Sequence, residues 1–218
     1  MFPEIHDIFI TGGTGYIGKR LVARLLEKGH RVTVLVRKGS ENKVMAGARI
    51  VTGNPFDASS FVHAIPANAV YIQLLGVAHP SPKKAAQFVA IDLASAKASA
   101  LAAANAKAAH IIYVSVSMEP SSIMAAYQEV RKQGERFFSQ TNIPCTCIRP
   151  WYVVGPGHYW PLLLLPVYGF ASLIPSMRRK ATAFGLVTIR QMLDTLVKSV
   201  ENKPAGIEII DISAIRKH

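Results

Sequence analysis

The chain has 218 residues, of which half are hydrophobic and 17% are charged. This length falls in the range of roughly 50–250 residues for one domain, and the composition excludes an intrinsically disordered protein. The formal net charge of +12 favours anionic ligands or surfaces. Because the basic residues are spread along the chain rather than interleaved with aromatic residues in a stripe, we expect no nucleic-acid partner.

Strand-like and helix-like segments alternate through the first 150 residues. Short apolar segments predict strands, and longer segments with helical periodicity predict helices. The expected strands are 5–11, 31–37, 48–52, 69–75, 111–115, 145–149 and 206–212, and the expected helices are 15–28, 83–108, 123–140 and 188–201. This order predicts an α/β fold built on a doubly wound parallel sheet. The regular alternation ends near Pro150, so we expect a single domain over 1–218 in which residues 151–205 form a small substrate-side lobe.

The cysteines and the N-terminal sequence bear on the cell compartment. Cys145 and Cys147 are too few for a disulfide framework, and at strand spacing both would face the core. No cluster of His, Asp and Glu has the spacing of a metal site, so none is predicted. The N-terminal sequence MFPEIHDIF carries early acidic residues and is unlike a cleavable signal sequence. A cytoplasmic location is the default expectation.

A glycine-rich segment, TGGTGYIG from Thr11 to Gly18, lies between the first expected strand and the first expected helix. Gly12 permits a tight turn, Gly15 lets backbone N–H groups approach a pyrophosphate, and Gly18 allows close packing of helix on strand. This context predicts a Rossmann dinucleotide-binding loop, and the alternative is a glycine turn without a ligand. The residues expected to bind the cofactor here are Gly12, Thr14, Gly15, Tyr16, Ile17 and Gly18.

The end of the second expected strand bears on the choice of cofactor. An enzyme that prefers NAD usually carries an acidic residue there to hold the ribose 2′-hydroxyl, and this chain has Arg37 and Lys38 instead. Cations at this point suit a 2′-phosphate, so we expect NADP, with NAD as the alternative. The two side chains could equally be solvated surface charges.

With the spacing G-x-x-G-x-x-G, the Val36-Arg37 strand end, and Ile148-Arg149-Pro150 followed by Gly155-Pro156-Gly157, the chain resembles the atypical and extended short-chain dehydrogenase/reductase superfamily. The likeness extends to proteins labelled NAD-dependent epimerase/dehydratase and covers nearly the whole chain. It implies further cofactor contacts near the adenine at Asn54, beneath the nicotinamide at Leu74, Leu75 and Gly76, and after the sixth strand at Pro150.

The same resemblance implies a Ser–Tyr–Lys catalytic group. Ser117 and Tyr127 match the serine and the tyrosine, although Ser115 would point the same way as Ser117 on a strand. The position of the lysine is Arg131, and Lys132 lies ~100° further around a helix. An arginine can hold ribose hydroxyls and stay charged, but its planar guanidinium is not equivalent to an ammonium group. Tyr127 could also be a partly buried helical residue without a catalytic role.

An apolar segment, 161–175, is interrupted by prolines and is shorter than the ~20 residues that span a bilayer. One interpretation is a lobe helix that lines an apolar pocket with Trp151, Tyr152, Tyr159 and Trp160. The other joins it to Arg178-Arg179-Lys180 as a peripheral membrane or protein contact over 161–180. His158 could touch a substrate or be a surface residue.

Two functions remain open from the sequence. The first is an NAD(P)-dependent oxidoreductase or epimerase that acts on a small, largely uncharged carbonyl or alcohol, with Ser117, Tyr127 and Arg131 as the catalytic group. The second is a non-catalytic NADP(H)-binding protein with a structural or redox-sensing role, which the arginine in place of lysine favours. The sequence indicates neither the substrate nor the oligomeric state.

Overall fold

The computed structural model describes residues 4–164 and 185–218. Its main sheet has seven parallel strands in the order β3-β2-β1-β4-β5-β6-β9. The strands are β1 (Asp7–Thr11), β2 (Arg31–Val36), β3 (Arg49–Thr52), β4 (Val70–Gln73), β5 (His110–Val114), β6 (Cys145–Ile148) and β9 (Ile207–Ile210). The strand order reverses between β1 and β4, which confirms the predicted doubly wound Rossmann fold.

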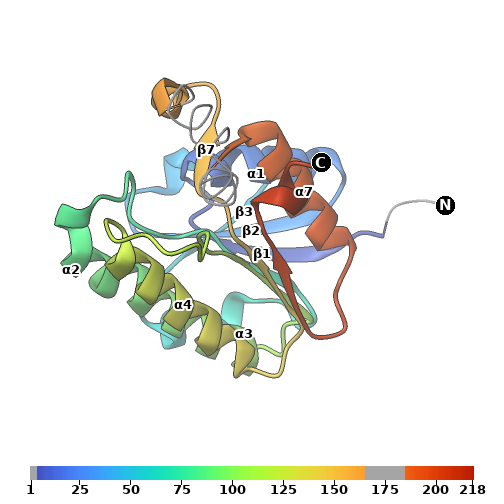
Figure 1. Cartoon of the computed structure of the whole chain (residues 1–218). Coiled ribbons are helices and arrows are strands. Elements are labelled where there is room, and N and C mark those ends of the chain that lie inside the picture. The colour runs from blue at the N-terminus through green and yellow to red at the C-terminus, as the bar shows by residue number, and fades with distance from the viewer. Residues whose placement is uncertain (1–3, 165–184) are drawn as a thin grey trace.

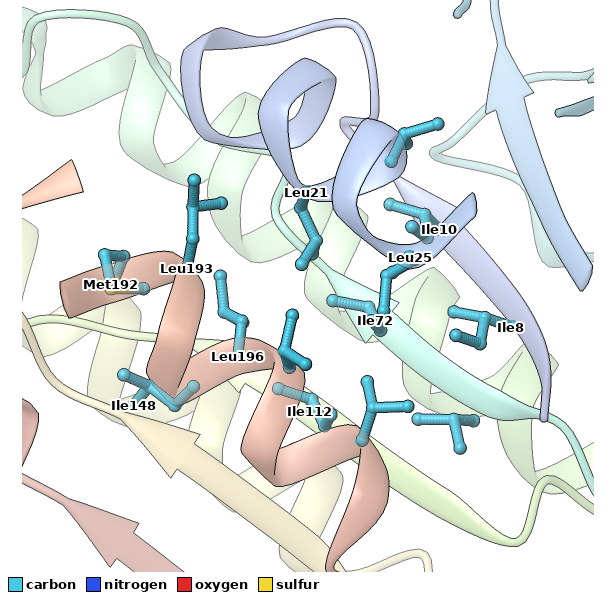
Figure 2. Packing of buried hydrophobic residues seen from close by; sticks show 14 of the residues in the cluster. Ile8, Ile10, Leu21, Leu25, Ile72, Ile112, Ile148, Met192, Leu193 and Leu196 are labelled. Carbon is cyan, nitrogen blue, oxygen red and sulfur yellow. The ribbon is translucent and has the colours of Figure 1, made fainter. Parts of the chain in front are cut away.

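Helices cover both faces of this sheet (Figure 1). One face carries α1 (Tyr16–Glu27) and α7 (Ile189–Glu201), and the other carries α3 (Ala94–Asn105) and α4 (Ala125–Ser139). Two short helices, α2 (Ala85–Gln87) and α8 (Ile212–Ile215), complete the set in the described part of the chain. Figure 2 shows Leu21 and Leu25 of α1 lying near Leu193 and Leu196 of α7 over the sheet.

Most of the predicted strands and helices differ from the observed ones by at most two residues at either end. The exception is the predicted helix 83–108, which the structure divides. A turn over Pro82–Lys84 and α2 come first, a π-helical segment, η5 (Phe88–Leu93), follows, and α3 ends at Asn105 because Lys107 has a positive φ of 55°. The wider π-helical segment carries Asp92, whose side chain is buried. Such segments are frequent at functional sites.

The predicted lobe, 151–205, contains a second, two-stranded parallel sheet of β7 (Tyr152–Val154) and β8 (Leu186–Thr188). A short 3₁₀ turn, η6 (Trp160–Leu164), follows β7, and residues 165–180 of the predicted contact segment lie outside the described residues. The helix α7 begins at a capping box of Thr188 and Gln191, and its apolar face packs on the main sheet beside α1. This helix therefore belongs to the layers of the main sheet, and the domain boundary stays a prediction.

Cys145 and Cys147 are both buried in the core cluster beneath α3 and α4, as their strand spacing predicts, with their sulfurs 3.8 Å apart. In residues 4–164 and 185–218, no helix is long and apolar enough to cross a membrane.

His110 should make the protein less stable in acid. Its ring is buried, and Nε2 lies 2.9 Å from the Thr146 hydroxyl. Burial lowers the pKa of His110 from 6.5 to about 4, so the neutral ring's contribution is fully present above pH 6.5 and is lost as pH falls toward 4. Urea denaturation should show that the free energy of unfolding is lower at pH 4 than at pH 7, with on the order of 3 kcal/mol of the difference due to His110.

The variant His110→Gln should show a smaller loss of stability between these two pH values than the wild type. The change His218→Gln, at an exposed C-terminal position, is the matched control and should keep the wild-type dependence. An unchanged pH dependence in His110→Gln would contradict the assignment.

Candidate functional site

The glycine loop lies between the end of β1 and the start of α1, and its glycines allow backbone segments to approach closely. Gly12 has a φ of 78°, and a Cβ there would lie 2.7 Å from the backbone nitrogen of Leu75. A Cβ at Gly18 would overlap the carbonyl oxygen of Gly12. Gly15 is the N-cap of α1, with no side-chain cap. The first N–H groups of α1 therefore have no side-chain acceptor at the N-cap and can bind an anion.

A cavity of about 460 Å³ opens over this loop at the carboxyl ends of β1, β2 and β4. This is where the strand order reverses, the usual ligand position in such sheets. Among the described residues that line it are three cations, Arg37, Lys43 and Lys84, and no Asp or Glu. The cavity therefore suits an elongated ligand that carries several negative charges.

The structure brings part of the predicted cofactor set to this cavity. The predicted residues that line it are Gly12, Thr14, Gly15, Arg37, Leu74, Leu75 and Gly76. Sequence reasoning missed several further lining residues, among them Ser40, Lys43, Phe56, Lys84, Gln87 and Ile91. No motif marks these positions, because they come from loops and short turns that only the fold brings together.

The other predicted cofactor residues are not among those that line the cavity: Tyr16, Ile17, Gly18, Lys38, Asn54 and Pro150. Ile17 packs against the core, and Gly18 meets the loop backbone. Asn54 accepts a hydrogen bond from the N–H of Phe56 through Oδ1, so it shapes the turn that presents Phe56. The carbonyl of Pro150 accepts a hydrogen bond from the N–H of Ser117.

An aromatic cluster borders the loop on the side of the lobe. The ring of Tyr16 meets His158 edge-on at 5.4 Å, and His158 lies 5.4 Å from His79. Burial raises the pKa of Tyr16, whose hydroxyl is buried without a hydrogen-bond partner. Burial and the nearby His79 lower the pKa of His158. The cluster thus connects the glycine loop to the lobe.

The three predicted catalytic residues come from the loop that follows β5 and from α4. Ser117 is buried, and its carbonyl accepts a hydrogen bond from Nε2 of Gln128, the neighbour of Tyr127. The half-buried Tyr127 packs its ring on Phe88 at 4.8 Å. Neither Tyr127 nor Phe88 lines the cavity, although Gln87 and Ile91, which stand on either side of Phe88 in the sequence, do. The hydroxyl of Ser115 is buried without a partner.

Arg131 is buried and forms an ion pair with Asp92, with 2.6 Å between Nη2 and Oδ1. Its Nη1 donates to the carbonyl of Val114, and its guanidinium carbon lies 5.2 Å from the ring centre of Tyr127. The other carboxylate oxygen of Asp92 accepts from the N–H of Val77. A Cβ at Gly76 would overlap the Arg131 guanidinium, so the pair lies directly beneath the cavity wall. Lys132, the next residue, is exposed.

The charge state of this pair follows from its surroundings. Burial opposes the charge on Arg131, but the neighbouring Tyr127, Tyr113 and Asp92 outweigh it, so the pKa of Arg131 is raised. Burial raises the pKa of Asp92, and Arg131 offsets only part of that effect. Arg131 is therefore a fixed cation, bound to a carboxylate, at the position where the resemblance implies a lysine.

The glycine loop, the cavity above it and the strand reversal are the elements of a dinucleotide site. A family model described as NAD(P)H-binding matches residues 12–155, which is 144 of the 218 residues. The chain belongs to this NAD(P)H-binding family. The match confirms the resemblance seen in the glycine loop, and it ends in the Gly155-Pro156-Gly157 loop after β7.

Ceramide reductase of Caulobacter vibrioides is 24% identical to this NAD(P)H-binding chain over 214 residues, covering 96% of the chain and 65% of the reductase. The chain thus spans less than two thirds of that relative's length. Among solved structures, the Bordetella bronchiseptica enzyme WbmG in complex with NAD has a TM-score of 0.69 at 20% identity, covering 95% of this chain and 73% of WbmG. A UDP-galactose 4-epimerase has a TM-score of 0.69 at 19% identity, covering 93% and 75%. These likenesses show the fold.

Replacing Gly18 by alanine should damage the loop, because the added Cβ would overlap backbone atoms of Gly12 and lie 2.7 Å from Cα of Gly13. We expect the free energy of unfolding to fall by about 1–3 kcal/mol, measured by urea denaturation, together with weaker NADPH binding. Gly206→Ala is the control, since nothing lies within 4 Å of its added Cβ. Equal effects of the two changes would contradict the close approach.

Removing the charge of Asp92 should leave a buried guanidinium unpaired. The variant Asp92→Asn is expected to lower the free energy of unfolding by about 3 kcal/mol or more. The matched control is Asp7→Asn, which breaks the exposed pair with Arg31 and should cost much less. Thermal or urea denaturation of both variants distinguishes a buried pair from a solvated one, and a small loss in Asp92→Asn would count against the burial.

Proposed function

We propose that this protein is an NADPH-dependent oxidoreductase that acts on an uncharged, largely apolar carbonyl or alcohol. The observation that carries the proposal is the cation-lined, acid-free cavity over the uncapped N-terminus of α1 at the strand reversal. The three cations, together with the N–H groups of the loop, suit the phosphates of a dinucleotide. The reduced nicotinamide, when bound, supplies a hydride to a carbonyl carbon.

The preference for NADP rests on the residues that line the cavity just after β2. Arg37, Ser40 and Lys43 all line it just after β2, where the adenosine ribose lies in proteins of this fold. Two cations and a hydroxyl suit a 2′-phosphate, whereas a ribose 2′-hydroxyl usually meets a carboxylate. Lys38 is exposed and does not line the cavity. We therefore assign the 2′-phosphate to Arg37 and Lys43.

The catalytic acid in this proposal is Tyr127. Its hydroxyl donates the proton that the carbonyl oxygen takes up as hydride reaches the carbon, which yields an alcohol. Arg131, 5.2 Å from the ring, supplies a positive charge that favours the phenolate left behind. Ser117 would hold the substrate oxygen, and Gln128 fixes the backbone of Ser117 relative to α4.

The substrate class follows from the surroundings of the nicotinamide end. Val77, Ala78 and Ile91 line the cavity there and offer apolar surface. Two polar residues, Lys84 and Gln87, line it as well, and Nζ of Lys84 donates to the carbonyls of Ala78 and His79. The likeness to a ceramide reductase supports a lipid-like carbonyl or alcohol.

The cofactor preference can be tested by calorimetry. The double variant Arg37→Ser, Lys43→Ser should bind NADPH about 10²–10⁴-fold more weakly, since each of the two lost charge-assisted contacts is worth roughly 1.5–3 kcal/mol, while NADH binding stays nearly unchanged. Lys38→Ser is the matched control and should bind NADPH like the wild type. Equal losses for NADPH and NADH would show that these cations do not read the 2′-phosphate.

The role of Tyr127 can be tested by steady-state kinetics with NADPH and a panel of apolar ketones. Tyr127→Phe should lower kcat by about 10²–10⁴-fold, because a positioned acid contributes that much, with NADPH affinity unchanged. Wild-type activity in the variant would remove the tyrosine from the mechanism.

A second function, a non-catalytic NADP(H)-binding protein, is favoured by one observation. The guanidinium of Arg131 is bound to Asp92 and to the carbonyl of Val114, so it is not free to hold a ribose in the way that the family lysine would. If no substrate in the panel is turned over while NADPH still binds tightly, this second function accounts for the protein better.

A further inference from the structure

The end of the lobe exposes large apolar side chains. Tyr159, Trp160, Leu162 and Leu163 are 56%, 49%, 39% and 80% exposed, and we call this group the lobe tip. It lies on or next to the 3₁₀ turn η6, which stands away from the main sheet beyond β7 (Figure 1). Contiguous exposed apolar side chains of this kind mark an interaction surface.

Trp160 of the lobe tip is held in place by contacts with His158 and Tyr152. The indole N–H of Trp160 donates to Nε2 of His158 at 2.7 Å, and its ring meets Tyr152 of β7 edge-on at 5.2 Å. His158 in turn contacts Tyr16 of the glycine loop. Trp160 is thus fixed at the surface, and His158 connects it to Tyr16 and to His79, which follows the lining residue Ala78.

Basic residues predominate in the sequence around the lobe tip. From Arg136 to Leu193 the sequence contains no Asp or Glu and six Lys or Arg residues. In the described part of this region, Arg190 is largely exposed at the start of α7, next to β8, although it also pairs with Asp194. At the base of the lobe, Arg20 donates to the carbonyl of Pro156 and Arg216 donates to the carbonyl of Leu186. The apolar tip therefore belongs to a basic part of the chain.

We propose that the lobe tip inserts into the surface of an anionic lipid bilayer. Tyr and Trp at the level of the headgroups, Leu below them and cations that face acidic lipids are the features of interfacial membrane binding. A second copy of the chain would bring two basic regions together, which opposes association. A stable protein interface buries about 800 Å² on each partner, whereas the tip is a single short turn. The proposal does not depend on the proposed reaction.

The direct test is co-sedimentation with vesicles of phosphatidylcholine alone or mixed with phosphatidylglycerol. Wild-type protein should sediment with the anionic vesicles, less so as salt rises, and only weakly with neutral ones. The double variant Trp160→Ser, Leu163→Ser should partition about tenfold less. The matched control is Leu101→Ser, which removes a 55% exposed leucine on α3 and should sediment like the wild type.

A second measurement on the folded, unmutated lobe tip is quenching of tryptophan fluorescence by brominated lipid. Quenching should persist in Trp151→Phe, in which Trp160 is the remaining tryptophan. The proposal is overturned if wild-type protein does not bind anionic vesicles, if the double variant binds them equally, or if Trp160 is not quenched. It is also overturned if light scattering shows a dimer that the double variant abolishes, because the tip would then face a second copy.

Discussion

The backbone of the glycine loop lies so close to its neighbours that side chains at Gly12 and Gly18 would not fit, and the arrangement of the site depends on this contact. At Gly12 an added Cβ would lie 2.7 Å from the nitrogen of Leu75, at the end of β4. At Gly18 it would overlap the carbonyl of Gly12 itself. The N-terminus of α1, the end of β1 and the segment after β4 are therefore held together, and the cavity opens where they meet.

The buried pair of Arg131 and Asp92 is the feature that most separates this site from its family pattern. Arginine stands where the resemblance implies lysine, and a carboxylate on the π-helical η5 forms an ion pair with it beneath Gly76. A buried cation needs such a partner, because removing a charge from water is costly. Arg131 stays positively charged near Tyr127, but its guanidinium is bound to Asp92 and to the carbonyl of Val114. It is therefore not available to bind a ribose, as the lysine implied by the resemblance would be.

The sequence predicted the parts of the fold that depend on local pattern. The strands, most of the helices and the Rossmann loop follow from apolar periodicity and from glycines between a strand and a helix. The π-helical turn, Asp92 as the partner of Arg131, and Lys43 and Lys84 as lining residues could not be predicted. Each depends on contacts between segments far apart in the chain, such as Asp92 of η5 with Arg131 of α4. Arg37 could be predicted as a lining residue because it directly follows β2, a strand that ends beside the glycine loop.

A crystal structure of the protein with NADPH would show directly whether the cavity over the glycine loop holds a dinucleotide. We expect the pyrophosphate over Gly12 to Gly15 at the start of α1, the 2′-phosphate beside Arg37 and Lys43, and the nicotinamide toward Gly76 and Ile91. A nucleotide bound elsewhere, or a cavity that stays empty at saturating NADPH, would contradict a dinucleotide site at this loop.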